Sequence, residues 1–138
     1  RRCRQHRRHR WTDAGLVRQI LINLLTNALD ATVAAQTAAY GTNPPPAPGR
    51  VTVSAQLVSE GKQVELSVRD EGSGIAPDDI ARIFEPFYTT KGRGRGTGLG
   101  LSICRELART LGGKITVASM PGEGSTFAVV LPTHPPSS

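Results

Sequence analysis

Residues 16–29, which read LVRQILINLLTNAL, decide the fold of this chain. Apolar residues recur there at spacings of three and four, and this period places them on one broad face of an α-helix. Thr12 and Asp13 precede the stretch and suit a helix N-cap. We therefore expect a helix from this point to about Ala35. Its apolar face would be made by Leu16, Val17, Ile20, Leu21, Leu24, Leu25, Ala28 and Leu29.

Two hairpins would provide the surface on which this helix packs. Apolar and polar residues alternate in residues 51–57 and 64–68, and a turn at residues 59–62 joins them, which is typical of an antiparallel hairpin. Residues 115–117 and 126–131 form a second pair of strands around a turn at residues 121–124. The prolines of residues 42–49 exclude regular structure between the first helix and the first strand.

Two more helices are expected between the hairpins. A short one starts at Pro77, a favourable first helical residue, and runs through Ile80 and Ile83. A longer one starts near Leu99 and ends at Gly112-Gly113, where glycine can adopt the left-handed conformation. The buried face of this longer helix would be made by Ile103, Leu107 and Leu111. Residues 88–98 are rich in Gly, Thr and basic residues and are expected to form a mobile loop.

This order of elements favours an α+β two-layer sandwich, with a mixed, largely antiparallel sheet and helices on one face. A chain of 138 residues is enough for one domain. Hydrophobic residues make up 38% and aromatic residues only 4%, so the core must be mainly aliphatic. No apolar run reaches the ~20 residues of a membrane span. Two cysteines are too few for a disulfide framework or a zinc site. We therefore expect a cytoplasmic domain without membrane contact.

The net charge of +6 is concentrated at the beginning of the chain. Residues 1–10 hold six of the 17 Lys and Arg residues, and all 11 acidic residues lie beyond them, so the remainder is formally neutral. A basic arm of this kind can contact phosphates. It lacks interleaved aromatic or apolar residues, however, so we favour a disordered extension and do not expect nucleic-acid binding.

Asn23 and Asn27 interrupt the aliphatic stretch and project from the same side of the helix, because they are four residues apart. A buried amide without partners is unfavourable by a few kcal/mol, roughly. Two alternatives are evenly balanced: the amides cap neighbouring backbone, or they bind a ligand. A carboxamide oxygen is a hard ligand that suits Mg²⁺.

Three glycine-containing clusters could also hold a ligand. In residues 70–75, which directly follow a strand, Gly72 and Gly74 allow close backbone approach and Asp70 could accept a hydrogen bond from an exocyclic amine. An ordinary turn explains this cluster equally well. In residues 122–127, a hairpin turn, Thr126 could reach a ligand.

Residues 94–101 alternate glycine with other residues at the start of a helix, where free amide groups and the helix dipole favour phosphate. Lys91, Arg93 and Arg95 add cations nearby. The cluster is not a dinucleotide-binding fingerprint, because no strand immediately precedes it. It is not a Walker A loop either, because no Gly-Lys-Ser/Thr follows.

In order and spacing, these clusters resemble the N, G1, F, G2 and G3 boxes of the histidine kinase ATP-binding domain. The F box corresponds to residues 83–91, which read IFEPFYTTK. The resemblance covers residues 13–132, leaving residues 1–12 as an extension and 133–138 as a tail. It implies the Bergerat fold of the GHKL superfamily, which gyrase, MutL and heat-shock chaperone ATPases share, with ATP held between the helices and a flexible lid.

The resemblance also implies roles for individual residues. Asn27 is similar to the family's Mg²⁺-binding Asn, and Asn23 to its partner near the phosphates. Asp70 resembles the Asp that binds the adenine amine, partly through water, and Thr126 a residue behind it. The adenine-pocket floor would be formed by Gly72, Gly74 and Ile75. The phosphate-binding helix start would be formed by Gly96, Gly98, Leu99, Gly100 and Leu101. Phe84 and Phe87 resemble anchors of the lid, residues 88–98.

Two departures from the family pattern matter. Asp30 stands where many histidine kinases carry a Lys, so we assign phosphate neutralisation to Lys91, supported by Arg93 or Arg95. Residues 89–91 read TTK, as in the nitrogen-regulation branch of sensor kinases. None of the three His residues, His6, His9 and His134, lies in a phosphoacceptor pattern, so we expect the acceptor on a separate domain.

The sequence thus predicts the catalytic domain of a sensor histidine kinase. It would bind Mg·ATP and donate the γ-phosphate to a His on a dimerisation domain, with a response regulator downstream. The isolated domain would be a monomer and the parent protein a homodimer. The alternatives are a GHKL-type ATPase and a degenerate nucleotide-binding module that only mediates contacts. Gyrase-type hydrolysis needs a Glu at the position of Asn23, whose neutral amide is no base.

Overall fold

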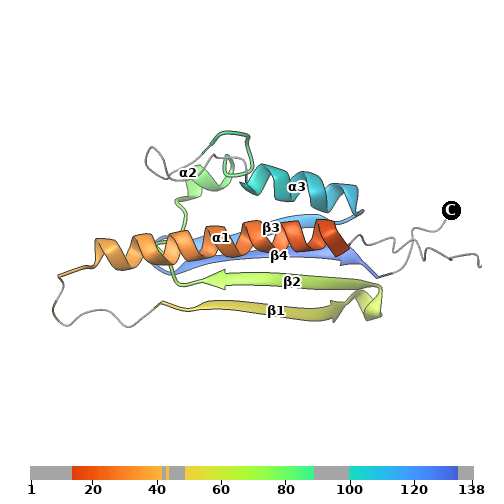
Figure 1. Ribbon diagram of the computed structural model, residues 1–138, viewed down its shortest axis with the longest axis horizontal. Helices are drawn as coiled ribbons and strands as arrows, with labels where there is room; N and C mark the ends of the chain where they lie inside the picture. The colour runs from red at the N-terminus through yellow and green to blue at the C-terminus, as the bar shows by residue number, and fades with distance from the viewer. Residues whose placement is uncertain (1–13, 42, 44–48, 89–99, 134–138) are drawn as a thin grey trace, which may run out of the picture.

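The computed structural model describes residues 14–41, 43, 49–88 and 100–133. Its elements follow the predicted order of helix, two strands, two helices and two strands. They are α1 (Ala14–Ala38), β1 (Val51–Val58), the 3₁₀ turn η1 (Ser59–Gly61), β2 (Gln63–Asp70), α2 (Pro77–Ile80), α3 (Gly100–Thr110), β3 (Lys114–Met120) and β4 (Gly124–Pro132). Figure 1 shows the long helix α1 running along the direction of the strands.

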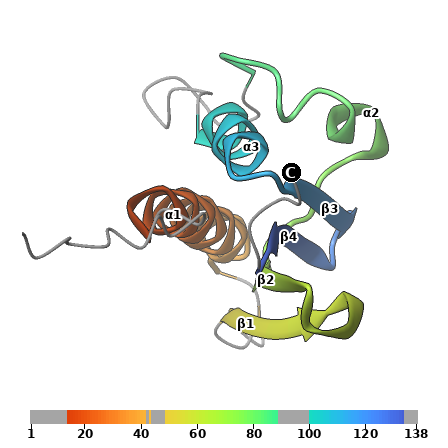
Figure 2. The same cartoon turned by 90° about the vertical axis from the view of Figure 1, so that its right-hand side faces the viewer.

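The four strands form a sheet in the order β1-β2-β4-β3, and each described pairing is antiparallel. The helices α1 and α3 lie side by side over one face of this sheet (Figure 2). The predicted α+β two-layer sandwich with helices on one face is therefore confirmed. Its central strands, β2 and β4, have helices above them and supply most of the buried sheet residues.

The core lies between the helices and the two central strands. Because side chains alternate along a strand, Val68 and its cross-strand partner Phe127 face the helices together. Eleven residues form one buried cluster: Ile20, Leu24, Ala28, Val68, Ile83, Cys104, Ala108, Leu111, Phe127, Val129 and Leu131. As expected from the composition, all but Cys104 and Phe127 are aliphatic.

Three details of the helices differ from the prediction. In α1, Leu29 was expected on the buried face but is 54% exposed, because the apolar stripe is wider than the surface that the sheet and α3 cover. In α3, Ile103 is 41% exposed, whereas Cys104 and Ala108 are fully buried. These small side chains let α3 approach α1 closely, and the Cys104 thiol lies 3.7 Å from the carbonyl oxygen of Ile20. The helix α2 ends before Ile83, which is nevertheless buried.

The predicted glycine end of α3 is confirmed. Gly112 has a φ of +79°, and its amide donates to the Arg109 carbonyl at 3.0 Å. The amide of Gly113 donates to the Ala108 carbonyl at 2.8 Å. This pair of hydrogen bonds is the Schellman motif, which satisfies the last carbonyls of the helix and turns the chain directly into β3.

The loop that follows β2 is held against the turn between β3 and β4. Gly122 donates its amide to the Ser73 carbonyl at 2.6 Å. Gly74 has a φ of +75°, and a Cβ there would collide with the carbonyl oxygen of Met120. The close approach expected at Gly74 is therefore an approach to the backbone of the chain itself. This contact fixes the path of the chain just beyond Asp70.

Replacing Leu24 by Ala should reduce the free energy of unfolding by about 2–5 kcal/mol, because it leaves a cavity in a fully buried site. Leu29→Ala, the same change on the exposed side of the same helix, should cost about 0.5 kcal/mol or less. Urea unfolding followed by circular dichroism measures both. Equal losses for the two variants would contradict the position of α1 on the sheet.

Replacing Gly74 by Ala should destabilise the chain more than replacing Gly122 by Ala. Both glycines have a positive φ, +75° and +81°, so both variants pay about 1–2 kcal/mol of backbone strain. Only Gly74 adds a collision, since nothing lies within 4 Å of a Cβ at Gly122. Thermal unfolding compares them, and indistinguishable melting temperatures would show that the loop is not held as described.

Candidate functional site

Asp70, the last residue of β2, carries a carboxylate that is only 1% exposed. Its Oδ1 accepts a hydrogen bond from the Gly72 amide at 2.9 Å. Its Oδ2 is buried and has no hydrogen-bond partner among the described residues. Burial raises the pKa of Asp70, while hydrogen bonds from the backbone of Gly72 and Ser125 act in the opposite direction. A buried acceptor without a partner is rare in proteins, and it favours a ligand that brings a donor.

Asp70 lies in a row of polar residues that crosses three strands. Ser125 of β4 is its cross-strand partner, and Ser119 of β3 is the partner of Ser125. Ser125 is 6% exposed, and its hydroxyl lies 2.8 Å from that of Ser119. All three residues share the face of the sheet that carries Phe127, which is the face toward the helices.

The expected place of Thr126 behind Asp70 is wrong. Thr126 pairs with Arg69, so its side chain is on the opposite face of the sheet from that of Asp70. Ser125 takes the place that was assigned to Thr126. The sequence carried a signal for this, because Phe127 is an apolar residue that must face the core and Ser125, two residues before it, must share its face.

On the helix side, Asn23 connects α1 to the beginning of α3. Its Nδ2 donates to the carbonyl oxygen of Gly100 over a long 3.5 Å, and its Oδ1 accepts from Gln19 at 2.9 Å. Asn27 lies one turn further along α1 and is half-buried. No hydrogen bond joins its side chain to another residue in the described ranges. The amide of Asn23 is thus partly used by backbone, and that of Asn27 is available to a ligand.

Gly72 brings the Asp70 loop onto the same side of α1. A Cβ at Gly72 would lie 2.9 Å from the carbonyl oxygen of Ala31 and 2.8 Å from the Oδ1 of Asp70, so only glycine fits. Ala31 is one helical turn beyond Asn27. From Asn23 to Ala31 the helix advances about 12 Å. One side of α1 therefore carries the start of α3 at one end, Asn27 in the middle and the Asp70 loop at the other end.

The glycine-rich segment is only partly described. Gly100, the first residue of α3, is exposed, and Leu101 packs at the edge of the core, as does Ile75 beyond the Asp70 loop. Lys91, Gly96, Gly98 and Leu99 lie outside the described residues, as do Arg93 and Arg95.

Phe84 and Phe87, both expected to anchor the lid, have different environments. The Phe84 ring meets Phe127 edge to face, with centroids 6.4 Å apart. Phe87 is 74% exposed and has a φ of +66°, so it does not pack as an anchor against the described residues, and the lid beyond residue 88 lies outside them. The ring of the neighbouring residue, Tyr88, packs at the edge of the core instead.

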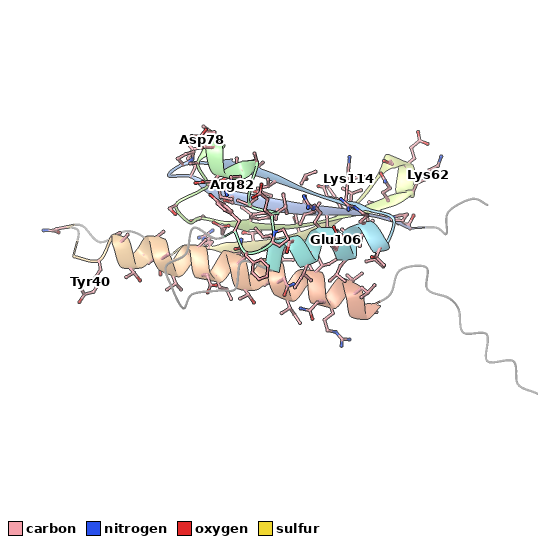
Figure 3. The ribbon with its side chains drawn as sticks, turned by 90° about the horizontal axis from the view of Figure 1, so that it is seen from above. Tyr40, Lys62, Asp78, Arg82, Glu106 and Lys114 are labelled. Atoms are coloured by element: carbon pink, nitrogen blue, oxygen red, sulfur yellow. The ribbon has the colours of Figure 1, made fainter. Side chains whose placement is uncertain are left out.

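Tyr88 fixes the chain just before residue 89 through contacts that no sequence pattern predicted. Its hydroxyl donates to the carboxylate of Asp79, and the guanidinium of Arg82 lies 4.5 Å from the centre of its ring. The hydrogen bond to Asp79 is the main reason why the pKa of Tyr88 is raised. In Figure 3, Asp78 and Arg82 lie toward one end of the sheet and Lys62 lies at the other.

The described residues include no group of three or more His, Cys, Asp or Glu side chains that could hold a metal ion. Burial raises the pKa of the Cys104 thiol to about 11, so it is protonated and unreactive. In the parts of the chain that the structure describes, no helix is both long and apolar enough to cross a membrane. Among the described residues, the polar groups available at this site are the carboxylate of Asp70, the side-chain amides of Asn23 and Asn27, and backbone groups.

Comparisons with known proteins agree with the fold. Residues 12–135 match the family described as histidine kinase-, DNA gyrase B-, and HSP90-like ATPase. The two-component sensor PprA of Pseudomonas aeruginosa is 45% identical over 124 residues, which are 90% of this chain and 12% of PprA. The signal transduction histidine-protein kinase AtoS of Escherichia coli is 36% identical over 123 residues, which are 89% of this chain and 18% of AtoS. The chain thus spans less than a fifth of either relative.

Two solved structures have the same fold. Full-length ShkA in complex with AMPPNP superposes with a TM-score of 0.70 at 37% identity, covering 88% of this chain and 22% of that one. The nucleotide-free catalytic domain of the histidine kinase ThkA superposes with a TM-score of 0.69 at 33% identity, covering 90% of this chain and 70% of that one. The chain therefore belongs to the histidine kinase-, DNA gyrase B- and HSP90-like ATPase family, with sensor histidine kinases among its relatives.

Proposed function

We propose that the chain is the ATP-binding catalytic domain of a two-component sensor histidine kinase. The observation that carries this proposal is the buried Oδ2 of Asp70, an acceptor without a partner among the described residues, at the end of a strand beside α1. The match to the ATPase family and the likeness to the AMPPNP complex of ShkA support it.

Asp70 would recognise the base. Adenine carries an exocyclic amine, which can donate to a carboxylate oxygen, whereas guanine carries a carbonyl at the same ring position. Because Asp70 already accepts from the Gly72 amide through Oδ1, its carboxylate is held in one orientation. Gly72, Gly74 and Ile75 would form the floor of the adenine pocket, fixed by the turn between β3 and β4.

The phosphates would lie toward the start of α3. This helix is 11 residues long, and its first amide groups lack intrahelical partners, as in other phosphate sites. Asn23 touches Gly100, which places it at this end of the site. Gly96, Gly98, Leu99, Gly100 and Leu101 would surround the phosphates. Lys91, with Arg93 or Arg95, would neutralise their charge.

A magnesium ion would be held by Asn27 together with the phosphates. Mg²⁺ prefers oxygen ligands and takes few of them from protein in nucleotide sites. The half-buried amide of Asn27 fits this requirement, because no described residue occupies it. The ion would shield the phosphate charge, and the chain's own contribution would be to position the nucleotide.

The geometry favours transfer of the γ-phosphate over its hydrolysis. Hydrolysis of the gyrase type needs a general base near the phosphates, and the residue in that place is Asn23, whose neutral amide cannot take a proton from water. The side chain of Asn23 makes hydrogen bonds with Gln19 and Gly100, and it also interacts with the Cys104 thiol. We therefore infer that the γ-phosphate is presented to a His on a separate dimerisation domain of a homodimeric parent, which then serves a response regulator. A cytoplasmic location follows from this role.

Replacing Asn27 by Ala should abolish the Mg²⁺-dependent part of ATP affinity, because it removes the one protein ligand assigned to the ion. Titration calorimetry with and without Mg²⁺ measures this. Thr26→Ala is the matched control, since Thr26 is the exposed neighbour on the same helix. If Asn27→Ala kept the full effect of Mg²⁺, the residue would have no place in the metal site.

Replacing Asp70 by Asn should weaken ATP binding about 10- to 150-fold, the equivalent of one charge-assisted hydrogen bond. It should also reduce the preference for ATP over GTP. Glu71→Gln, a change of the adjacent exposed carboxylate, serves as the control and should leave both properties unaltered. Equal binding of ATP and GTP by the unmodified chain would argue against base recognition by Asp70.

A further inference from the structure

Ser119 lies at the far end of the polar row, two strands away from Asp70, and makes three hydrogen bonds. Its Oγ accepts from the Ile75 amide at 2.8 Å. It donates to the carbonyl oxygen of Gly124 at 3.0 Å and lies 2.8 Å from the Oγ of Ser125. Through these contacts Ser119 joins the loop after Asp70 to both strands of the second hairpin.

The direction of these hydrogen bonds follows from counting protons. A serine hydroxyl has one proton to donate and two lone pairs that accept. Ser119 uses its proton on the Gly124 carbonyl and one lone pair on the Ile75 amide. With both of these hydrogen bonds made, its second lone pair is left for Ser125, which then donates in the pair of hydroxyls. The proton of Ser125 is thus directed toward Ser119.

This direction explains the state of the Asp70 carboxylate. Ser125 is the cross-strand partner of Asp70, and such partners have Cβ atoms about 4.5–5.5 Å apart. A hydroxyl on the neighbouring strand and the same face of the sheet is a natural donor to a buried carboxylate, yet Oδ2 has no partner among the described residues. The hydroxyl proton of Ser125, which could otherwise be donated to Oδ2, is donated to Ser119.

We propose that Ser119 is a positioning residue for base selection, because it keeps the Ser125 hydroxyl from occupying the Asp70 oxygen that receives the adenine amine. The proposal rests on the base-binding role proposed for Asp70. Ser119 itself need not touch the nucleotide. Its effect should appear in the choice between bases.

The test compares Mg·ATP with Mg·ITP, whose hypoxanthine base carries a carbonyl where adenine carries its amine. Affinities for the full 138-residue chain are measured by titration calorimetry. In Ser119→Ala the Ser125 proton is released and can turn to Asp70. ATP affinity should then fall about three- to tenfold, the size of one hydrogen bond, while ITP affinity stays the same. The ATP to ITP preference should fall by the same factor.

Two further variants separate this effect from a loss of local structure. Ser119→Thr keeps the hydroxyl and should keep the preference. The double variant Ser119→Ala/Ser125→Ala removes the released hydroxyl as well, so the preference should return toward that of the unmodified chain. A purely structural role predicts instead that the double variant is no better than the single one. Ser67→Ala is the matched control, because it breaks the cross-strand hydroxyl pair with Ser54 on the opposite face.

The outcomes are distinct. An unchanged preference in Ser119→Ala, or a lowered one that the double variant does not recover, overturns the proposal. If Ser119→Ala does not fold by circular dichroism, Ser119→Cys takes its place, with a weaker hydrogen-bonding group of similar size. A preference lost in Asp70→Asn but kept in Ser119→Ala overturns only the role of Ser119. Equal binding of ATP and ITP by the unmodified chain overturns the role of Asp70 and, with it, that of Ser119.

Discussion

The hydrogen bond from the Gly72 amide to the Asp70 carboxylate is the interaction on which the site depends. It turns the chain sharply at the end of β2 and fixes the orientation of a buried charge. The same turn brings Gly72 against the Ala31 carbonyl of α1, so the sheet and the helix meet there with no room for a side chain. Asn27 and Asn23 lie further along the same side of α1, and Asn23 contacts Gly100, the first residue of α3.

Asp70 is costly to bury, and the fold offsets only part of this cost. Amide groups of Gly72 and Ser125 stabilise its charged form, but burial has the larger effect and raises its pKa. Between the ordinary pKa of a carboxyl group and this raised value, the folded state holds its proton more tightly than the unfolded state, so stability falls as the pH rises through that range. The amine of a bound adenine would donate to the carboxylate and so offset the remaining free-energy cost of burying it. A carboxylate that destabilises the free protein is therefore well suited to binding this ligand.

Patterns within one element made most of the fold predictable from the sequence. The three-and-four spacing of residues 16–29 predicted α1, and alternation predicted both hairpins. The prediction that Ile103 is buried was wrong because the hydrophobic pattern takes no account of side-chain size. The close contact between α1 and α3 requires small side chains, and Cys104 and Ala108 provide them. Leu29 was misplaced for a related reason, since no pattern within a helix tells how much of its apolar face a sheet will cover.

The site was less predictable, because it depends on register between strands. Asp70 and Asn27 could be proposed from local motifs, but the row from Asp70 through Ser125 to Ser119 exists only once β2, β4 and β3 pair. The turn motif alone does not distinguish Thr126 from Ser125, whereas the alternation back from Phe127 places Ser125 on the face of Asp70. The contacts of Asp79 and Arg82 with Tyr88 could not be predicted either, because they depend on how the chain folds back after α2.

If the free oxygen of Asp70 receives the adenine amine, as we infer, nucleotide binding must change the pKa of this carboxyl group. Carbon-detected NMR titration of the Asp70 carboxyl group, with and without Mg·AMPPNP, measures that pKa in both states. We expect a pKa above the ordinary aspartate value in the free chain and a lower one in the complex, because a hydrogen bond to the charged form stabilises it. A pKa that stays the same on nucleotide binding, or rises, would contradict it.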